Sequence, residues 1–388
     1  MKYILELLLY SPRVYAGLDH LMVYAAREAR KQGYTLVCVY CDNMSEQPDI
    51  QRDIEIAGGI VELVSSTPKK MRGDIFKLYA KYHPKVVDTH FIVRIKLWTA
   101  FLSLLYGARH YTHEHSMLGR SIHKYVRRKG WTKRILTGTY LWLVNLLSKK
   151  VLCASNAIRK QYCSFCYGPK DKIEVMYLGT EIREPRYTQE QARRLTGVPL
   201  DAKVIANVSS FDPVKGIDVL FAALSLLKNR GVDFIFVSVG GMRKVTPESQ
   251  DYVDSLQELA YHYEIENQII WLGRRNDVQD ILPLADIYVH PSRSEGLACV
   301  LLEASVARLP LICSREGGMV EVVLNRQNGL VVPKEDPAAL ADAIQQLLEH
   351  PDNDYGEKAH ERVEEIFNLE KQAKQLINMQ IGKPIKKD

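Results

Sequence analysis

Short apolar runs alternate with amphipathic stretches along the first part of the chain. Residues 3–10 form an apolar run of strand length, and residues 18–32 follow with apolar positions at helical spacing and end at Gly33. The same order recurs at residues 35–41, at 86–90 with a helix near 97–106, and at 151–155. Buried strands separated by helices are typical of crossover units, so the pattern predicts a doubly wound first domain.

A second set of such segments begins after a polar stretch at residues 179–189 that contains Pro185. Its predicted strands are residues 204–208, 234–239, 268–272, 287–290, 310–314 and 329–332. The pattern therefore predicts an α/β protein of two doubly wound, Rossmann-like domains with parallel sheets, at residues 1–183 and 184–388.

The composition is globular, because 46% of the 388 residues are hydrophobic and 25% are charged. No window reaches the roughly 18 consecutive apolar residues of a membrane-spanning helix, and residues 135–147 come nearest. The seven cysteines are scattered and no secretion signal precedes the first strand, which favours a reducing, cytoplasmic location. Cys38 and Cys41, like Cys163 and Cys166, have a spacing that zinc sites use, but the first pair lies in an apolar strand, so we favour a packing role.

Charge is divided unevenly between the two domains. The net charge of the chain is +6, yet the first half is strongly basic and the remainder is acidic. A basic amphipathic stretch begins at Arg120 and ends at Arg134, with Tyr125 and Trp131 among its basic residues. Such a stretch fits either an anionic membrane surface, reached from the inner face, or a solvated helix face. No nucleic-acid-binding motif accompanies the charge, so nucleic acid is not expected as a partner.

Residues 294–304 carry the most specific chemistry in the sequence. Two carboxylates, Glu295 and Glu303, bracket a predicted helix start, and Gly296 permits a close backbone approach. The next three amides would be first-turn donors aimed at an anion such as a diphosphate, from Leu297, Ala298 and Cys299. Glu303, two predicted helical turns beyond Glu295, could accept hydrogen bonds from a ribose diol. Taken alone, the pattern also fits an amphipathic helix with solvated glutamates.

Three motifs in a fixed order make the sequence resemble glycosyltransferase family 4, retaining enzymes with the two-domain GT-B fold. The family signature is a pair of glutamates separated by seven residues, which Glu295 and Glu303 match. Residues 211–220 (FDPVKGIDVL) are similar to the family's segment with a phosphate-binding lysine before Gly and a helix. Downstream, the resemblance continues in residues 314–321 (SREGGMVE) and 328–330 (NGL).

The resemblance implies a nucleotide sugar, expected to be a UDP-sugar, held mainly by the second domain. Lys215 would bind the diphosphate, Glu295 the sugar hydroxyls and Glu303 the ribose. A fixed ammonium and helix amides would stabilise charge on the leaving diphosphate, so neither a metal nor a cofactor is expected. The expected catalytic residues are His115, Lys215 and Glu295. The expected donor-binding residues are Gly17, Ser210, Lys215, Arg274, Glu295, Gly296, Leu297, Ala298, Cys299 and Glu303.

Two positions depart from the family pattern. The family often has an arginine five residues before the lysine, where this chain has Ser210. Arg274, Arg275 or a basic residue of the first domain would have to replace that cation, or donor binding is weak. Ala298 replaces a frequent glycine, which is a milder change because alanine still supplies a backbone amide.

In the first domain the resemblance points to loops that follow strands. Residues 11–17 replace the family's glycine-rich loop near the diphosphate, and Gly17 is the only glycine retained. In residues 111–116 (YTHEHS), His115, in preference to His113, matches a histidine near the transferred sugar, and a structural histidine fits equally well. The acceptor is expected at Arg13, Tyr15 and His90.

The resemblance therefore implies a retaining, metal-independent transferase whose two domains face each other across a cleft. The last helix, about residues 368–388, is expected to return to the first domain. The paired aspartates of residues 352–354 (DND) fit a turn or helix cap, not a metal site. The expected acceptor is a glycan or lipid-linked molecule of bacterial polysaccharide or lipopolysaccharide synthesis. Two alternatives remain. One is an epimerase or hydrolase of nucleotide sugars, and the other is a catalytically weak subunit that binds nucleotide sugars, which Ser210 in place of the arginine keeps open.

Overall fold

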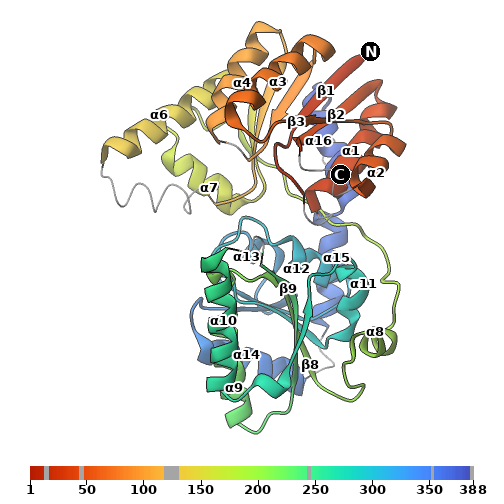
Figure 1. Ribbon diagram of the computed structural model, residues 1–388, viewed down its shortest axis with the longest axis vertical. Helices are drawn as coiled ribbons and strands as arrows, with labels where there is room; N and C mark the ends of the chain where they lie inside the picture. The colour runs from red at the N-terminus through yellow and green to blue at the C-terminus, as the bar shows by residue number, and fades with distance from the viewer. Residues whose placement is uncertain are drawn as a thin grey trace. The chain divides into compact units, whose positions relative to one another are not determined.

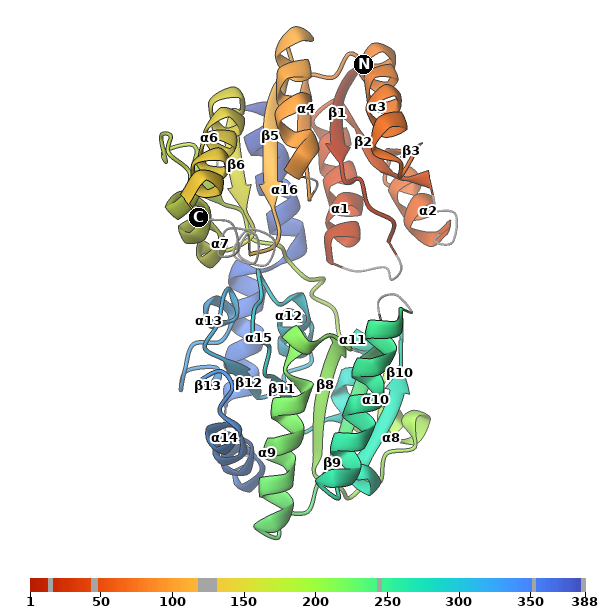
Figure 2. The same cartoon turned by 60° about the vertical axis from the view of Figure 1, so that its left-hand side comes forward.

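The computed structural model describes residues 1–12, 17–42, 48–91, 93–117, 131–242, 246–350 and 354–384. The chain divides into two compact units (Figures 1 and 2). Unit 1 comprises Met1–Glu181 and Phe367–Asp388, and unit 2 comprises Ile182–Ile366. Each unit is built on one parallel sheet, which confirms the predicted fold class of two Rossmann-like α/β domains.

Unit 1 has a seven-stranded sheet in the order β3-β2-β1-β4-β5-β6-β7, and all its strand pairs are parallel. The strands are β1 (Lys2–Leu7), β2 (Tyr34–Cys41), β3 (Ile60–Val64), β4 (Val86–Thr89), β5 (Arg109–Glu114), β6 (Lys150–Cys153) and β7 (Ile173–Val175). The helices are α1 (Gly17–Lys31), α2 (Pro48–Ile56), α3 (Pro68–Tyr82), α4 (Val93–Leu105), α6 (Trp131–Leu147), α7 (Asn156–Phe165) and α16 (Leu369–Ile381).

The two faces of the unit 1 sheet are covered by different helices. Leu5, Leu7 and Val87 belong to a core cluster with residues of α3 and α4. Since side chains alternate along a strand, Glu6 lies on the opposite face, where α1 and α16 pack against each other. Tyr111 donates a hydrogen bond of 2.9 Å from that face of β5 to a backbone carbonyl of α16. The last helix, blue in Figure 1, is thus part of unit 1.

Unit 2 has a six-stranded sheet in the order β10-β9-β8-β11-β12-β13. The strands are β8 (Val204–Ser210), β9 (Ile235–Gly241), β10 (Ile269–Gly273), β11 (Ile287–His290), β12 (Leu311–Ser314) and β13 (Gly329–Val332). The α-helices are α8 (Gln189–Thr196), α9 (Ile217–Asn229), α10 (Pro247–His262), α11 (Val278–Ile281), α12 (Cys299–Val306), α13 (Met319–Val322), α14 (Pro337–Glu349) and α15 (Tyr355–Ile366). Short 3-10 turns are η2 (Pro213–Lys215), η3 (Glu266–Gln268) and η4 (Leu282–Leu284).

In both sheets the first strand of the unit pairs with its fourth strand, β1 with β4 and β8 with β11. The strand order reverses at this point, and open α/β sheets bind ligands beside the carboxyl ends of the strands at such a switch. Gly17 begins α1, the helix after β1, and the loops that carry Lys215 and Glu295 follow β8 and β11. The fold therefore places the predicted site residues of each unit where its topology favours a ligand.

The cysteines are all free thiols, and Cys38 and Cys41 are buried in β2. In the part of the chain that the structure describes, no helix has both the length and the apolar character needed to cross a membrane.

Candidate functional site

Lys215 is presented by the loop that follows β8. Asp212 caps this turn, because its Oδ1 accepts a hydrogen bond from the Val214 amide at 3.0 Å. Gly216 then has a φ of 67°, and a Cβ atom there would lie 2.2 Å from the backbone oxygen of Pro291. Both conditions require glycine. The Lys-Gly pair of the motif therefore lets the lysine loop touch the loop after β11.

Glu295 lies in that second loop, between β11 and α12. The backbone of Glu295 is held by the loop after β12, because Gly318 donates its amide to the Glu295 carbonyl at 3.3 Å. Gly317 has a φ of 56°, and a Cβ atom there would lie 1.9 Å from the same carbonyl oxygen. The two glycines of the downstream motif thus position the first glutamate of the signature.

Lys215 and His290 converge on one carboxylate oxygen. Both Lys215 Nζ and His290 Nε2 bond to Oε1 of Glu295, the histidine at 3.1 Å, and neither contact uses Oε2. The side chains of Lys215 and Glu295 are each only 13% exposed. Burial alone would raise the pKa of Glu295, but the His290 hydrogen bond and the Lys215 charge hold that pKa well below its usual range. Glu295 is therefore a fixed anion that orients the Lys215 ammonium.

Glu303 has a different environment in α12. The residue is half-buried, and burial raises the pKa of its carboxyl to about 7. The two glutamates of the signature thus have opposite pKa shifts, one lowered by a cation and a histidine and the other raised by desolvation.

The structure corrects the predicted start of this helix. α12 begins at Cys299 with Ala298 as its N-cap residue, so Leu297 lies before the helix. Of the three amides that the sequence assigned to the first turn, only that of Cys299 belongs to it. Glu303 accordingly lies one turn into α12, not two helical turns beyond Glu295, which is itself in the loop.

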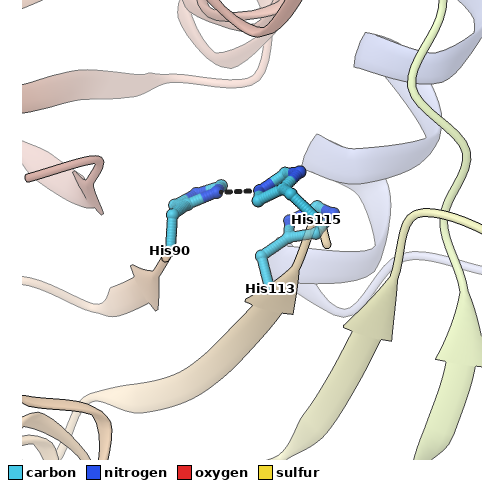
Figure 3. Close-up of side chains that lie close together, drawn as sticks. All are labelled: His90, His113 and His115. Atoms are coloured by element: carbon cyan, nitrogen blue, oxygen red, sulfur yellow. Dashed lines mark hydrogen bonds between the residues drawn. The ribbon is translucent and has the colours of Figure 1, made fainter. Parts of the chain in front are cut away.

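Three histidines gather at the carboxyl ends of β4 and β5 in unit 1 (Figure 3). His90 Nδ1 and His115 Nε2 are hydrogen bonded at 2.7 Å, and His113 stacks on the His115 ring with centroids 4.5 Å apart. His90 Nε2 lies 2.8 Å from Oε2 of the buried Glu6. The ligand atoms of the three rings lie within 4.8 Å of one another. His90 Nδ1 and His115 Nε2 are closer together than the roughly 3.3 Å that separates two nitrogen ligands of one tetrahedral metal ion, so this arrangement is a hydrogen bond.

Comparisons with known proteins match both units. The model of "Glycosyltransferase Family 4" matches residues 15–184, and that of "Glycosyl transferases group 1" matches residues 188–368. The chain belongs to glycosyltransferase family 4. This result confirms the family and the GT-B fold expected from the three motifs.

Curated relatives match this family 4 chain over part of their length. An uncharacterised glycosyltransferase of Methanocaldococcus jannaschii is 27% identical over 246 residues, which are 60% of this chain and 60% of the relative. The D-inositol 3-phosphate glycosyltransferase of Corynebacterium urealyticum is 32% identical over 222 residues, which are 54% of this chain and 51% of the relative. The match thus spans only between half and two thirds of these relatives. The solved structure of Anabaena HepE in complex with UDP has a TM-score of 0.78 at 18% identity, covering 98% of this chain and 100% of HepE.

The arginine that family 4 often has before the lysine is replaced by Ser210, at the end of β8. Ser210 pairs with Gly241 of β9, and a Cβ atom on Gly241 would lie 3.1 Å from Cγ of Arg274. The Arg274 stem therefore crosses the strand next to Ser210. Its guanidinium makes a long bond of 3.4 Å to the Met242 carbonyl, whereas Arg275 is engaged by both carboxylate oxygens of Asp277 at 2.8 and 2.6 Å.

The predicted acceptor residues fare differently. Arg13 and Tyr15 lie outside the described residues, as do most of the stretch from Arg120 to Arg134 and residues 352–353. His90 is a correction, because its side chain is fully buried and both ring nitrogens have partners within unit 1. His90 thus contacts His115 and does not present its ring to an acceptor. Gly17 is the first residue of α1.

Sequence reasoning missed His290, although this residue ends β11 five positions before Glu295. It also missed a set of buried polar residues behind the histidines of unit 1, namely Glu6, Asp88 and Gln380. Glu6 stands alone in the apolar run of β1, and an acid in a buried strand is a signal that could have drawn attention to it.

Proposed function

We propose that this chain is a retaining, metal-independent glycosyltransferase that moves a sugar from a UDP-sugar to a glycan or lipid-linked acceptor. The observation that carries the proposal is the Lys215–Glu295–His290 cluster at the switch point of unit 2. A lysine fixed by a carboxylate beside a helix N-terminus suits a diphosphate leaving group. Unit 2 would be the donor-binding domain and unit 1 the acceptor-binding domain.

The chemistry assigned to each residue follows from its charge. As the bond between sugar and diphosphate breaks, charge grows on the leaving oxygens, and the Lys215 ammonium stabilises that charge without moving. Glu295 keeps Oε2 for a sugar hydroxyl while Oε1 holds the lysine. Glu303 accepts the two ribose hydroxyls once its carboxyl is ionised. Arg274 supplies the second phosphate-binding cation in place of the family's arginine.

Retention of configuration would follow a front-face substitution. Glu295 is anchored by two hydrogen-bonding partners, so it is a poor candidate for a nucleophile. The departing phosphate would accept the proton of the acceptor hydroxyl. This mechanism therefore needs no side chain of unit 2 as a general base. His115 of unit 1 would donate a hydrogen bond to an oxygen of the donor.

The acceptor is proposed to belong to bacterial polysaccharide or lipopolysaccharide synthesis at an anionic membrane surface. The support is a group of exposed apolar side chains on α4 and α6, two helices that pack together in unit 1. Five of its side chains are each at least 50% exposed, namely Phe101, Leu104, Leu105, Leu136 and Leu146. Arg134 and Lys149 are exposed at the two ends of α6. Exposed apolar residues with basic neighbours suit an anionic lipid surface.

A panel of nucleotide sugars separates this proposal from its alternatives. The purified chain should slowly hydrolyse one donor in the absence of acceptor, and the released sugar should carry the donor's anomeric configuration. A new sugar on the same nucleotide would instead identify an epimerase. Binding of UDP without any turnover would identify a nucleotide-sugar-binding subunit, the alternative that Ser210 favours.

A further inference from the structure

Behind His115, unit 1 contains a chain of buried polar groups that runs from the middle of the sheet to the carboxyl end of β5. Gln380 of α16 donates to Oε1 of Glu6 at 2.7 Å, Oε2 of Glu6 meets His90 Nε2 at 2.8 Å, and His90 Nδ1 meets His115 Nε2 at 2.7 Å. Each group uses one atom toward the preceding group and another toward the next.

This series of hydrogen-bonded groups ends at a nitrogen atom of His115 that has no hydrogen-bond partner among the described residues. His115 Nδ1 is buried, and among the described residues nothing hydrogen bonds to it. A buried polar atom without a partner is costly, so its retention points to a ligand that satisfies it. Phe91 stacks on the same ring at 4.6 Å and holds a φ of 43°, which is strained for a residue other than glycine. The strained Phe91 backbone at the end of β4 thus places the Phe91 ring against the ring of His115.

Only two directions of the hydrogen bonds are consistent along the chain, because each neutral imidazole has one N–H and one lone pair. If Glu6 is charged, it accepts from His90, and His115 then presents a lone pair at Nδ1. If Glu6 is neutral, its hydroxyl donates to His90 Nε2, His90 Nδ1–H donates to His115 Nε2, and His115 presents Nδ1–H.

The surroundings of Glu6 select the second direction. The Gln380 amide nitrogen donates to Oε1 of Glu6 and also to Oδ2 of Asp88 at 3.2 Å, so two buried carboxyls lie close together around one nitrogen atom. Burial and the Asp88 charge raise the pKa of Glu6 well above its ordinary value. Burial would raise the pKa of Asp88 as well, but His90 and His113 lower it to about 2, so Asp88 takes the charge.

The imidazole rings of His90 and His115 are both neutral. Burial lowers the pKa of His90 to about 4 against the opposing pull of Asp88. Burial, together with His113, His90 and Lys96, lowers the pKa of His115 well below its ordinary value. The charged groups that face these rings are Asp88 on β4, Lys96 on α4 and Glu114 on β5, and Lys96 is paired with Glu114 at 2.7 Å.

We propose that Glu6 is a positioning residue which, acting as a neutral hydrogen-bond donor through His90, fixes His115 as the tautomer that presents Nδ1–H to an oxygen of the bound donor. The ligand partner of His115 in this inference rests on the proposed function. The tautomer itself does not, because Glu6, His90 and Gln380 set it within unit 1.

NMR of the protein with nitrogen-15-labelled histidine side chains tests the His115 tautomer directly. Nitrogen-15 shifts of His115, assigned with a His115→Gln variant, should show a protonated Nδ1 and a bare Nε2 in the wild-type chain at pH 7. Free imidazole side chains favour the opposite tautomer, so a protonated Nε2 at His115 would overturn the proposal without any activity measurement. His110→Gln is the matched control, because His110 is a buried histidine of β5 that bonds Ser148 on the other face of the sheet. This control should leave the His115 signals unchanged.

Variants of Glu6 separate a neutral donor from a carboxylate. Glu6→Gln keeps an N–H toward His90 and a carbonyl toward Gln380, so it should retain the wild-type tautomer and turnover within about threefold. Glu6→Leu and His90→Phe remove the donor or the link, and should lower turnover on the order of 10- to 100-fold with unchanged UDP affinity. If Glu6→Gln loses as much turnover as Glu6→Leu, the neutral-donor assignment is wrong. If the wild-type chain turns over no nucleotide sugar, the proposed function fails, and the wild-type spectrum still decides the tautomer.

Discussion

Glu295 and Glu303 belong to one signature but differ in the state of their carboxyl groups. Glu295 accepts bonds from Lys215 and His290, which hold its pKa well below the usual range. For Glu303, burial is the cause of the shift, and it raises the pKa of the carboxyl to about 7. One carboxylate is thus ionised before a ligand binds, whereas under the proposed function the other becomes fully charged as the ribose hydroxyls bind.

UDP affinity should therefore depend on pH through Glu303. The raised pKa means that about half of the Glu303 carboxyls are protonated near pH 7, and only the ionised form accepts both ribose hydroxyls, so the Kd for UDP should fall from pH 6 to pH 8. Calorimetry should also show weaker binding by about 1.5 to 3 kcal/mol for Glu303→Ala. Glu303→Gln isolates the contribution of this carboxyl from that of the UDP phosphate. A Glu303→Gln profile that parallels the wild type would remove Glu303 from the ribose site.

Lys215 should matter more for turnover than for binding. Under the proposed function its ammonium stabilises charge that develops mainly in the transition state, so Lys215→Ala should lower turnover about 10²- to 10³-fold and weaken UDP binding much less. EDTA should change the wild-type rate little. Lys228→Ala, on the same loop–helix unit but paired with Glu264, is the control lysine and should keep the wild-type rate. Loss of activity in EDTA with recovery in manganese would contradict the metal-independent mechanism.

The two neighbouring arginines should have unequal effects. Arg274 crosses Gly241 beside Ser210 and is only weakly engaged, whereas Arg275 is held by Asp277. Arg274→Ala should weaken UDP-sugar binding by about 1.5 to 3 kcal/mol, and Arg275→Ala should change it little. Titration of both variants by calorimetry distinguishes them. Equal losses, or a loss confined to Arg275→Ala, would show that the second phosphate cation is not Arg274.

At the scale of elements, the sequence predicts the strands that are buried on both faces. β1, β2, β8 and β11 are mostly apolar, although β1 contains Glu6 and β8 contains Asn207, because strands inside a parallel sheet are buried on both faces. The edge strands of unit 1, β3 and β7, were missed, whereas those of unit 2, β10 and β13, were predicted. Residues of β3 are largely half-exposed and β7 has three residues, so neither leaves an apolar run long enough to detect.

The candidate site was predictable where it lies on loops that follow buried strands. Lys215, Glu295 and Glu303 lie in short motifs whose glycines are required by close backbone contacts. The order of the motifs along the chain indicated the family, which the spacing of the two glutamates alone did not. The start of α12 was placed too early because the loop is ordered by Gly317 and Gly318 from a distant motif, a contact that local pattern cannot reveal. The Glu6–His90–His115 chain joins three strands and needed the sheet order, as did the role of Gln380, 374 positions from Glu6.

The exposed apolar side chains of α4 and α6 should bind anionic vesicles. Leu104 and Leu105 are 63% and 66% exposed, and removing such side chains from water favours binding, while the basic neighbours add attraction that salt screens over about 10 Å at 0.1 M. In sedimentation assays, Leu104→Glu with Leu105→Glu should reduce binding to anionic vesicles and leave UDP affinity unchanged. Leu200→Glu is the control, because Leu200 is an exposed leucine of unit 2. Equal binding of the wild type to neutral and anionic vesicles would count against this surface.

At the scale of the whole molecule, the chain enters unit 2 after Glu181 and leaves it after Ile366. The return is anchored at Thr180, which exchanges backbone hydrogen bonds with Phe367 and Leu369 at 2.9 and 3.0 Å. Gly179 makes this approach possible, since a Cβ atom there would lie 2.7 Å from the Phe367 carbonyl oxygen. The last helix therefore ties the end of the chain to the core of the unit in which the chain begins.

This connectivity predicts that damage to α16 affects unit 1 and spares the nucleotide site of unit 2. Leu376 and Ile377 are fully buried, so Leu376→Asp or Ile377→Asp should strongly lower the melting temperature of unit 1, since a buried unpaired charge is costly. UDP should stabilise only the other transition, by about 2.7 kcal/mol at 100 times its Kd. Calorimetric melting with and without UDP measures both effects, with Lys374→Ala on the exposed face of α16 as the control. If the α16 variants lower the UDP-sensitive transition by the same amount, the two units unfold together and the separation of stability is wrong.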